Sequence, residues 1–273
     1  MQVWAVANQK GGVGKTTTAV TLAGLMAQRG LRVMIVDLDP HGSVTSYFGL
    51  DPDETQNNVY TLFRVGVLRG AKVPLEVVRK TRFPNLYIMP SSAALATLDR
   101  QMGSQEGMGL ILTKALAELR SEFDHVIIDC PPVLGVLMVN ALAASRNLLI
   151  PVQTDYLAIK GLERMLRTLN MILQARREPL SYLIVPTMFD RRTKASIDSL
   201  QTLRERYSEF VWNSIIPVDT LFREASRRGA PLSYLTPQSR GVIAYAGLLI
   251  SLLGQGAQPR HEERQPQPEL HSP

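Results

Sequence analysis

Seven short apolar segments, rich in β-branched residues, recur along the chain and read as strands. They lie at residues 2–7, 32–37, 85–90, 124–129, 147–153, 181–188 and 210–216. Segments of helical length separate most of them, at residues 15–29, 107–121, 158–176 and 194–208. Strands that alternate with helices predict βαβ units. We therefore expect an α/β fold with a mostly parallel, twisted sheet and helices on both faces.

The pattern also sets the expected domain limits. Residues 1–254 are predicted to form one domain, with an irregular excursion and one short helix within residues 51–82. A last helix is expected over residues 238–254. From Gln255 to Pro273 the chain turns polar and carries four prolines, which predicts a disordered tail.

Composition narrows the class of protein. Hydrophobic residues make up 45% of the chain, enough for a buried core. Cys130 is the single cysteine, which rules out an intrachain disulfide framework and favours a reducing compartment. No apolar stretch reaches the roughly 20 residues that span a bilayer. No signal peptide precedes the first strand, so we expect a cytoplasmic protein.

The net charge of +6 is unevenly distributed. Residues 160–240 hold 14 Lys or Arg against 8 Asp or Glu, whereas the rest of the chain is balanced. A basic face of this kind attracts nucleic acid or an anionic surface. The alternative is an arginine-rich face that is merely solvated.

The strongest chemical signal follows the first strand. Residues 8–17 read NQKGGVGKTT and lead into a predicted helix. Glycines let backbone N–H groups turn inward around phosphate oxygens, and the helix N-terminus adds partial positive charge. In such a loop Lys15 reaches the β- and γ-phosphates and the Thr16 hydroxyl ligates Mg²⁺. The nucleotide-binding residues predicted from the loop itself are Gly11, Gly12, Val13, Gly14, Lys15, Thr16 and Thr17.

Acidic residues follow two other strands. Asp37 and Asp39 lie two apart on an extended segment, and Asp129 ends an apolar strand. Because ligands bind at the carboxyl ends of strands in such folds, these carboxylates are expected beside the phosphate loop. An aspartate in the position of Asp129 binds Mg²⁺ through water. The predicted cofactors are therefore ATP and Mg²⁺, with Thr16 and Asp129 around the metal.

The phosphate loop departs from the general pattern, because Gln9 stands where its first glycine would fall and Lys10 adds a second lysine. This loop resembles the deviant Walker A motif of the ParA/MinD family. The resemblance implies that Lys10 reaches across a dimer interface to the partner's nucleotide. The segment VDLDPHGSVTSYFGL resembles a switch segment of the family. This resemblance gives Asp39 the role of positioning the attacking water and places Asp37 near the metal. His41 stands where the family often has glutamine and is expected to be an exposed loop residue.

The resemblance covers residues 2–253 and is closest to ParA-type partition ATPases. It implies an ATP-dependent homodimer, a partner protein that stimulates slow hydrolysis, and a plasmid, chromosome or large protein assembly as cargo. The alternatives are a MinD-like or flagellar-number regulatory ATPase, or a metabolic P-loop enzyme of the dethiobiotin-synthetase kind. Lys10 and the switch segments count against the last of these.

The surface to which the dimer binds is a separate question. Residues 189–193 (FDRRT) resemble a chromosome-partition pattern in which an arginine corresponding to Arg192 binds DNA without sequence preference. Val218 and Leu221 replace two arginines that the partition proteins carry. Charge alone adds further candidate DNA contacts, namely Arg223, Arg227 and Arg228. We expect DNA binding and a position on the nucleoid or at the pole; a solvated face is the alternative.

Two further expectations rest on the resemblance. The adenine is expected beside Met188, Pro217 and Asp219, in the loops after residues 188 and 216. MinD-like proteins end in an amphipathic helix that dips into the membrane. Here the last helix is followed by a tail with few large apolar residues, so no stable membrane anchor is expected.

Overall fold

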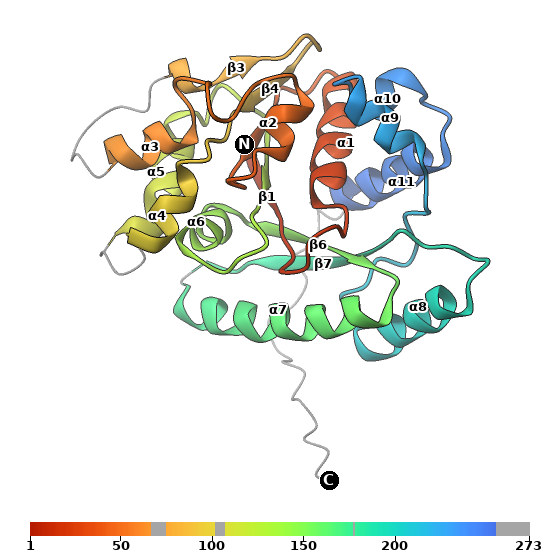
Figure 1. The fold of residues 1–273 in the computed structure, drawn as a ribbon. Helices are drawn as coiled ribbons and strands as arrows, with labels where there is room; N and C mark the ends of the chain where they lie inside the picture. Colours follow the sequence, from red (N-terminus) through yellow and green to blue (C-terminus); the bar gives the residue numbers. More distant parts are fainter. Residues whose placement is uncertain (67–74, 102–106, 177, 255–273) are drawn as a thin grey trace.

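The computed structural model describes residues 1–66, 75–101, 107–176 and 178–254 (Figure 1). The predicted disordered tail, residues 255–273, lies outside this part of the chain. The described strands form one sheet in the order β3-β4-β2-β5-β1-β6-β7. All neighbouring strands are parallel except β3, which runs antiparallel to β4.

The strands match most of the predicted segments to within one or two residues. Their bounds are β1 Gln2–Val6, β2 Val33–Asp37, β3 Arg79–Lys80, β4 Leu86–Met89, β5 His125–Asp129, β6 Asn147–Gln153 and β7 Ser181–Thr187. The helices are α1 Lys15–Gln28, α2 Ser43–Tyr47, α3 Val59–Gly66, α4 Leu95–Gln101, α5 Ile111–Glu118, α6 Val136–Ala144, α7 Tyr156–Ala175, α8 Lys194–Arg206, α9 Leu221–Arg227, α10 Leu232–Leu235 and α11 Arg240–Gly254. Single 3-10 turns lie at Leu75–Val77 and Met108–Leu110.

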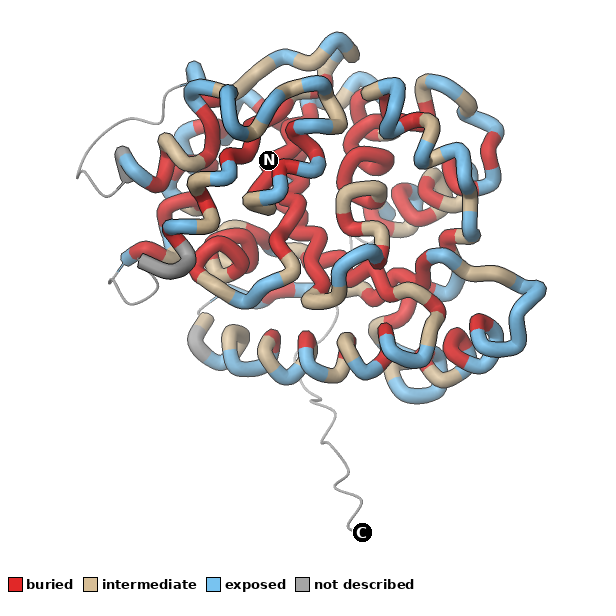
Figure 2. The backbone as a smooth tube through the Cα atoms, viewed as in Figure 1, coloured by how far each residue is buried: buried red, intermediate tan, exposed pale blue. Residues whose placement is uncertain are grey.

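Helices cover both faces of the sheet, as the alternation of elements predicts. Successive side chains of a strand point to opposite faces. Accordingly Val3 and Ala5 join one core with α3 to α8, whereas Trp4 and Val6 join the other with α1 and α11. Figure 2 shows the buried strands as a continuous inner layer beneath the exposed outer sides of the helices.

The predicted strand at residues 210–216 is wrong. This segment runs beside β7 but makes only isolated bridges, at Val211 and Pro217. The backbone N–H groups of Trp212 and Ile216 donate to Ile184 and Pro186, which leaves two extra residues between these bonds. Pro186 has no N–H to return, so a regular ladder cannot continue. The short edge strand β3, within the predicted irregular region, was not expected from the sequence.

The register aligns the carboxyl ends of the three central strands. Val6 pairs with Asp129 between β1 and β5, and Asp37 pairs with Asp129 between β2 and β5. The loops that follow these strands therefore leave the sheet side by side. The loop after β6 joins them on the other side of β1.

Gly24, in the middle of α1, offers a test of this packing. A Cβ there would lie 2.7 Å from the Cβ of Pro231 and 3.2 Å from the Ser233 hydroxyl. We expect Gly24→Ala to lower the free energy of unfolding by about 1–3 kcal/mol, because overpacking displaces α10. Gly247 in α11 is the matched control, since its Cβ would meet nothing closer than 3.9 Å. Gly247→Ala should be neutral or stabilising by up to about 1 kcal/mol. If Gly24→Ala and Gly247→Ala change the free energy of unfolding in urea by the same amount, the packing of α1 against α10 is contradicted.

Candidate active site

The loop between β1 and α1 has the backbone of a phosphate cradle. Gly12 and Gly14 have φ values of 73° and 92°, in the left-handed region where glycine is favoured. A Cβ built at Gly11 or Gly12 would meet nothing within 4 Å, so space lies open beside these two residues. Helix α1 begins immediately afterwards, with the Thr18 N–H donating to the Gly14 carbonyl. Its free N-terminal N–H groups face the loop, where an anion is favoured.

Side chains from neighbouring strands fix this loop. Asn8 is fully buried; its amide donates to the Pro151 carbonyl at 2.8 Å, and its oxygen accepts from the Lys10 N–H at 2.9 Å. Thr187, at the end of β7, donates to the carbonyl of the buried Val13 at 2.9 Å. The loop is therefore held in shape by contacts to β6 and β7. The sequence analysis missed both anchors, although Asn8 directly follows an apolar strand.

Lys15 and Thr16 lie where the sequence analysis expects them. Lys15 is only 8% exposed, and its ammonium donates to the Lys10 carbonyl at 3.3 Å. The Thr16 hydroxyl donates to Oδ2 of Asp129 at 2.6 Å. This bond brings the phosphate loop and the end of β5 together.

Two buried carboxylates meet at the ends of β2 and β5. Asp37 and Asp129 are 0% and 1% exposed and occupy paired register positions. Burial raises the pKa of Asp129 to about 8, with the Asp37 charge as a second cause. Burial likewise raises the pKa of Asp37 to about 7, opposed by hydrogen bonds from Thr45. Oδ1 of Asp129 has no hydrogen-bond partner. Such a pair is stabilised by a nearby cation, which reverses the unfavourable burial of negative charge.

Asp39 differs from Asp37 in its surroundings. Its side chain is 13% exposed, and Oδ1 accepts from the His41 N–H at 3.0 Å and contacts His41 Nδ1 at 2.8 Å. The His41 side chain is 80% exposed, as expected. The carboxylate of Asp37 is instead held by the Thr45 N–H and hydroxyl, at 2.8 and 2.7 Å. The sequence analysis did not single out Thr45.

Lys10 forms an ion pair within its own chain. Its ammonium lies 3.5 Å from Oδ1 of Asp155, the residue that caps the N-terminus of α7 through the Leu157 N–H. The two side chains are 30% and 46% exposed. Ion pairs in such settings contribute about 0–1 kcal/mol, so the contact can be exchanged at small cost. The sequence analysis missed Asp155, which shows no motif.

These residues fit a nucleotide with its magnesium ion. The loop offers backbone N–H groups and Lys15 for phosphates, and the Thr16 hydroxyl with two carboxylates for a hard cation. This donor set suits Mg²⁺, which takes phosphate oxygens and water beside one or two carboxylates.

The candidate adenine residues are less uniform. Met188 has a left-handed backbone with φ of 53°, is 37% exposed, and its Cε approaches the Gly14 Cβ position to 3.9 Å. The Asp219 carboxylate accepts from the N–H groups of Leu221 and Gly241, both at 3.0 Å, and so joins α9 to α11. Pro217 ends the segment beside β7 and lines an apolar groove with α11.

Most of the arginines selected for DNA binding pair with acidic residues nearby. Arg192 forms a bidentate ion pair with Asp190, in which Nε and Nη2 donate to the two carboxylate oxygens at 2.9 and 2.7 Å. Arg227 and Arg228 both bind Glu224, at distances of 2.8 to 3.0 Å. Arg223 is exposed, and no ion pair is recorded for it within the described residues. All three pairs are exposed, so each can exchange its carboxylate for a phosphate.

Comparison with known proteins identifies the family. The model of an AAA domain matches residues 1–182. The chain is 33% identical over 256 residues to the sporulation initiation inhibitor protein Soj of Bacillus subtilis, covering 93% of this chain and 99% of that one. It is 35% identical to the chromosome-partitioning ATPase Soj of Treponema pallidum, covering 92% and 96%. The chain belongs to the ParA/MinD family of P-loop ATPases.

One solved structure of similar sequence and fold contains a bound nucleotide analogue. The cobyrinic acid a,c-diamide synthase of Mycobacterium smegmatis, with a bound ATP analogue and magnesium, is 34% identical, with a TM-score of 0.80 and coverage of 94% and 96%. Its ligands agree with the predicted cofactors. Family membership confirms the predicted fold class and ATPase activity. The chain is thus an ATPase of the kind that partitions or positions a cellular cargo.

The buried carboxylates predict how stability depends on pH in the absence of metal. Because folding raises the pKa of Asp129 to about 8 and of Asp37 to about 7, the folded state binds extra protons. The contribution of these two groups to the free energy of unfolding is then greatest below the unfolded pKa of about 4 and is lost as pH rises through 7 and 8.

We expect Asp129→Asn to reduce that fall, since the amide stays neutral. Urea unfolding between pH 5 and 9, in EDTA and without nucleotide, measures the effect. The exposed Asp198→Asn provides the control and should follow the wild type. If the free energy of unfolding of Asp129→Asn depends on pH as that of the wild type does, Asp129 is not the source of the fall.

Proposed function

We propose that the protein is an ATP-switched dimer whose catalytic site is completed by Lys10 of a second copy. The position of Lys10 carries this proposal. Its ammonium is held by Asp155 on the flank of the loop, while Lys15 occupies the buried position beside the loop backbone. One lysine already serves the protomer's own phosphates. A partly exposed second cation is then available to supply positive charge in trans, as an arginine finger does.

The other residues receive roles from their positions. The N–H groups of residues 11–17 and Lys15 would bind the phosphates, and Thr16, Asp37 and Asp129 would hold a magnesium ion, which when bound supplies positive charge beside the β- and γ-phosphates. Asp39 orients the attacking water, because its carboxylate is less buried than Asp37 and lies at the same edge of the sheet. Met188, Pro217 and Asp219 remain the proposed surroundings of the base.

A dimer surface is supported by exposed apolar side chains at this same edge. They follow β5 and β6, the two strands that flank β1 and its phosphate loop. Their exposed fractions range from 40% to 67%, and the four residues are Val133, Leu134, Tyr156 and Leu157. Apolar side chains clustered around a binding site mark an interaction surface. Contact between two such edges would bring Lys10 of each copy toward the nucleotide of the other.

We further propose a cytoplasmic protein that acts with a partner stimulating hydrolysis and with DNA as a surface, with a nucleoid or polar position following from these contacts. Chromosome partitioning is named for the Treponema relative and supports this choice. Residues 1–254 would act as one ATPase domain. Among the described residues, no helix has the length and apolar character needed to cross a membrane.

The name of the Mycobacterium structure supports a second candidate function, an ATP-dependent synthase that forms amides. Phosphate release by the purified protein separates the two. Turnover that protein partners or DNA stimulate supports the switch, whereas turnover that requires a small-molecule acid as acceptor supports the synthase.

Lys10 and Lys15 should give different defects when replaced by alanine. Lys15→Ala is expected to abolish ATP binding in calorimetry, because the loop N–H groups alone do not neutralise the phosphates. Lys10→Ala should still bind ATP but remain monomeric in sedimentation with ATP and Mg²⁺, with very slow hydrolysis. A Lys10 variant that dimerises and turns over normally would exclude the trans role, whatever the result at Lys15.

Asp39→Ala should separate assembly from hydrolysis. Loss of a group that orients water slows turnover by about 10²–10⁴-fold. The ATP-bound dimer should nevertheless form and persist, since the hydrogen bonds recorded for the Asp39 side chain among the described residues go to His41. Sedimentation and phosphate release on the same sample measure both properties. Wild-type turnover would remove Asp39 from the mechanism.

A further inference from the structure

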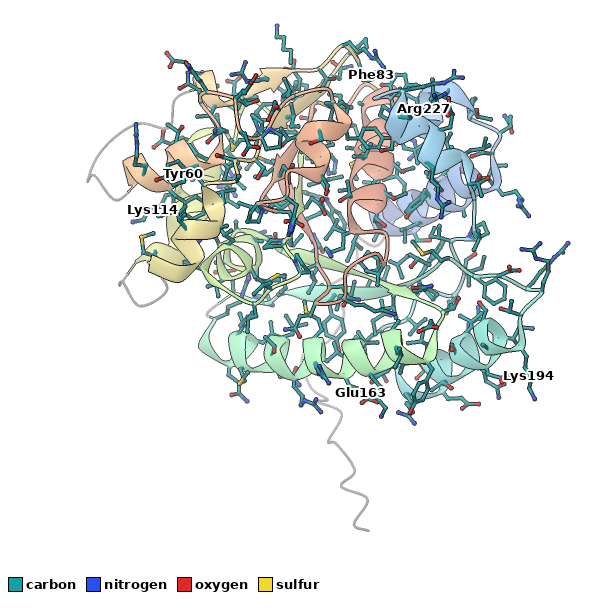
Figure 3. All side chains as sticks on the ribbon, in the orientation of Figure 1. Tyr60, Phe83, Lys114, Glu163, Lys194 and Arg227 are labelled. Atoms are coloured by element: carbon teal, nitrogen blue, oxygen red, sulfur yellow. The ribbon has the colours of Figure 1, made fainter. Side chains whose placement is uncertain are left out.

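An open groove lies between α2, the edge strand β3 and helix α9, apart from the phosphate loop. Its volume is about 630 Å³, and its floor includes the aromatic side chains of Tyr47 and Phe48. Five cationic residues line it and no acidic residue does: Arg79, Lys80, Arg82, Arg227 and Arg228. Figure 3 shows Arg227 and Phe83 at this end of the molecule.

Residues far apart in sequence build the groove. The Arg82 guanidinium donates to the carbonyls of Arg228 and Gly229, at 2.6 and 3.1 Å, and lies 5.1 Å from the centre of the Phe83 ring. Tyr47 donates to the Ala230 carbonyl at 2.9 Å. These contacts tie β3 and α2 to the end of α9. The cations are therefore held on two fixed walls.

Much of the positive charge in the groove is not neutralised. Arg79 and Lys80 have no carboxylate partner among the recorded ion pairs of the described residues. Arg79 donates to the Gln56 carbonyl at 2.6 Å, but its buried Nε has no hydrogen-bond partner. A single acidic side chain, Glu224, pairs with both Arg227 and Arg228, which are 78% and 61% exposed. The groove keeps a net positive charge even with this pair intact.

The groove is connected to the nucleotide site. A second cavity of about 390 Å³ is lined by Thr16 and Thr17 of the phosphate loop and shares Ser46, Tyr47 and Ser226 with the groove. Helix α2 forms the common wall. Within this helix Thr45 holds the Asp37 carboxylate, while Tyr47 contacts the end of α9. A change at Asp37 on nucleotide binding therefore acts on the helix that shapes the groove.

We propose that this groove binds the sugar–phosphate backbone of duplex DNA and is a main nucleic-acid contact of the ATP-bound protein. The inference rests on the proposed function, in which DNA is the surface, and it assigns the contact to β3 and α9. Five cations spread along an open groove suit successive phosphates of a polyanion better than one small anion. Exposed ion pairs such as Arg227–Glu224 exchange at small cost for phosphate contacts. Arg227 and Arg228, chosen from the sequence by charge alone, thus join three residues that the sequence analysis did not select.

Fluorescence anisotropy with a labelled random-sequence duplex tests the proposal, on the full chain with Mg²⁺ and ATP and again without nucleotide. Lys80→Glu and Arg227→Glu should each weaken binding to all duplexes alike and lower the slope of log affinity against log salt by about 1. Lys114→Glu is the control of equal charge change; it lies on α5, across the molecule from Arg227 in Figure 3. It should bind DNA as the wild type does.

Glu224→Gln gives a test that misfolding cannot imitate. It removes the acidic competitor for Arg227 and Arg228, so DNA binding should tighten and its salt slope should steepen. If Lys80→Glu and Arg227→Glu bind as the wild type while Arg192→Glu loses binding, the groove is excluded and DNA remains the surface. If the wild type with ATP binds no duplex at about 50 mM salt, where phosphate contacts are strongest, the groove proposal fails. Sedimentation of the wild type with ATP and Mg²⁺ tests the proposed dimer separately from DNA binding.

Discussion

The burial of two carboxylates side by side is the constraint on which the site depends. Asp37 and Asp129 end adjacent strands in paired register, and neither is exposed. Burial of negative charge is unfavourable unless a cation or hydrogen-bond donors balance it. The Thr16 hydroxyl donates to one oxygen of Asp129, and the Thr45 hydroxyl donates to one oxygen of Asp37. Oδ1 of Asp129 has no hydrogen-bond partner. A metal ion beside the phosphate loop would balance this buried negative charge.

The phosphate loop and helix α2 are also positioned by contacts at this edge of the sheet. The phosphate loop is held from β6 and β7 through Asn8 and Thr187, so contacts within the protein fix its shape. Helix α2 carries Thr45 toward Asp37 and Tyr47 toward α9, which links the site to the opposite end of that helix. Three cations with proposed contacts outside the protomer, Lys10, Arg192 and Arg227, are each paired with a carboxylate of their own chain. Because those pairs are exposed, each cation can change partner at small cost.

The sequence predicted the fold and the centre of the site because both leave local signals. Apolar runs marked six of the strands, and the glycines and lysines of residues 10–15 marked the phosphate loop. The segment at residues 210–216 was wrongly predicted as a strand. Its own residues suit a strand, but Pro186 on the neighbouring strand β7 lacks the N–H that a regular ladder requires. Thr45, Asp155 and Arg82 act through contacts distant in sequence. No spacing rule connects Asp155 to Lys10, or Arg82 to the carbonyls of Arg228 and Gly229.

The central claim is that one protomer holds an incomplete catalytic site and a second copy completes it through Lys10. The most direct measurement is the rate of phosphate release per protomer by the unmodified protein, with ATP and Mg²⁺, over a wide range of protein concentration. We expect the specific rate to rise with concentration, to level off as dimers saturate, and to fall to background in EDTA. A specific rate that is independent of concentration, down to dilutions at which sedimentation finds only monomers, would contradict the claim.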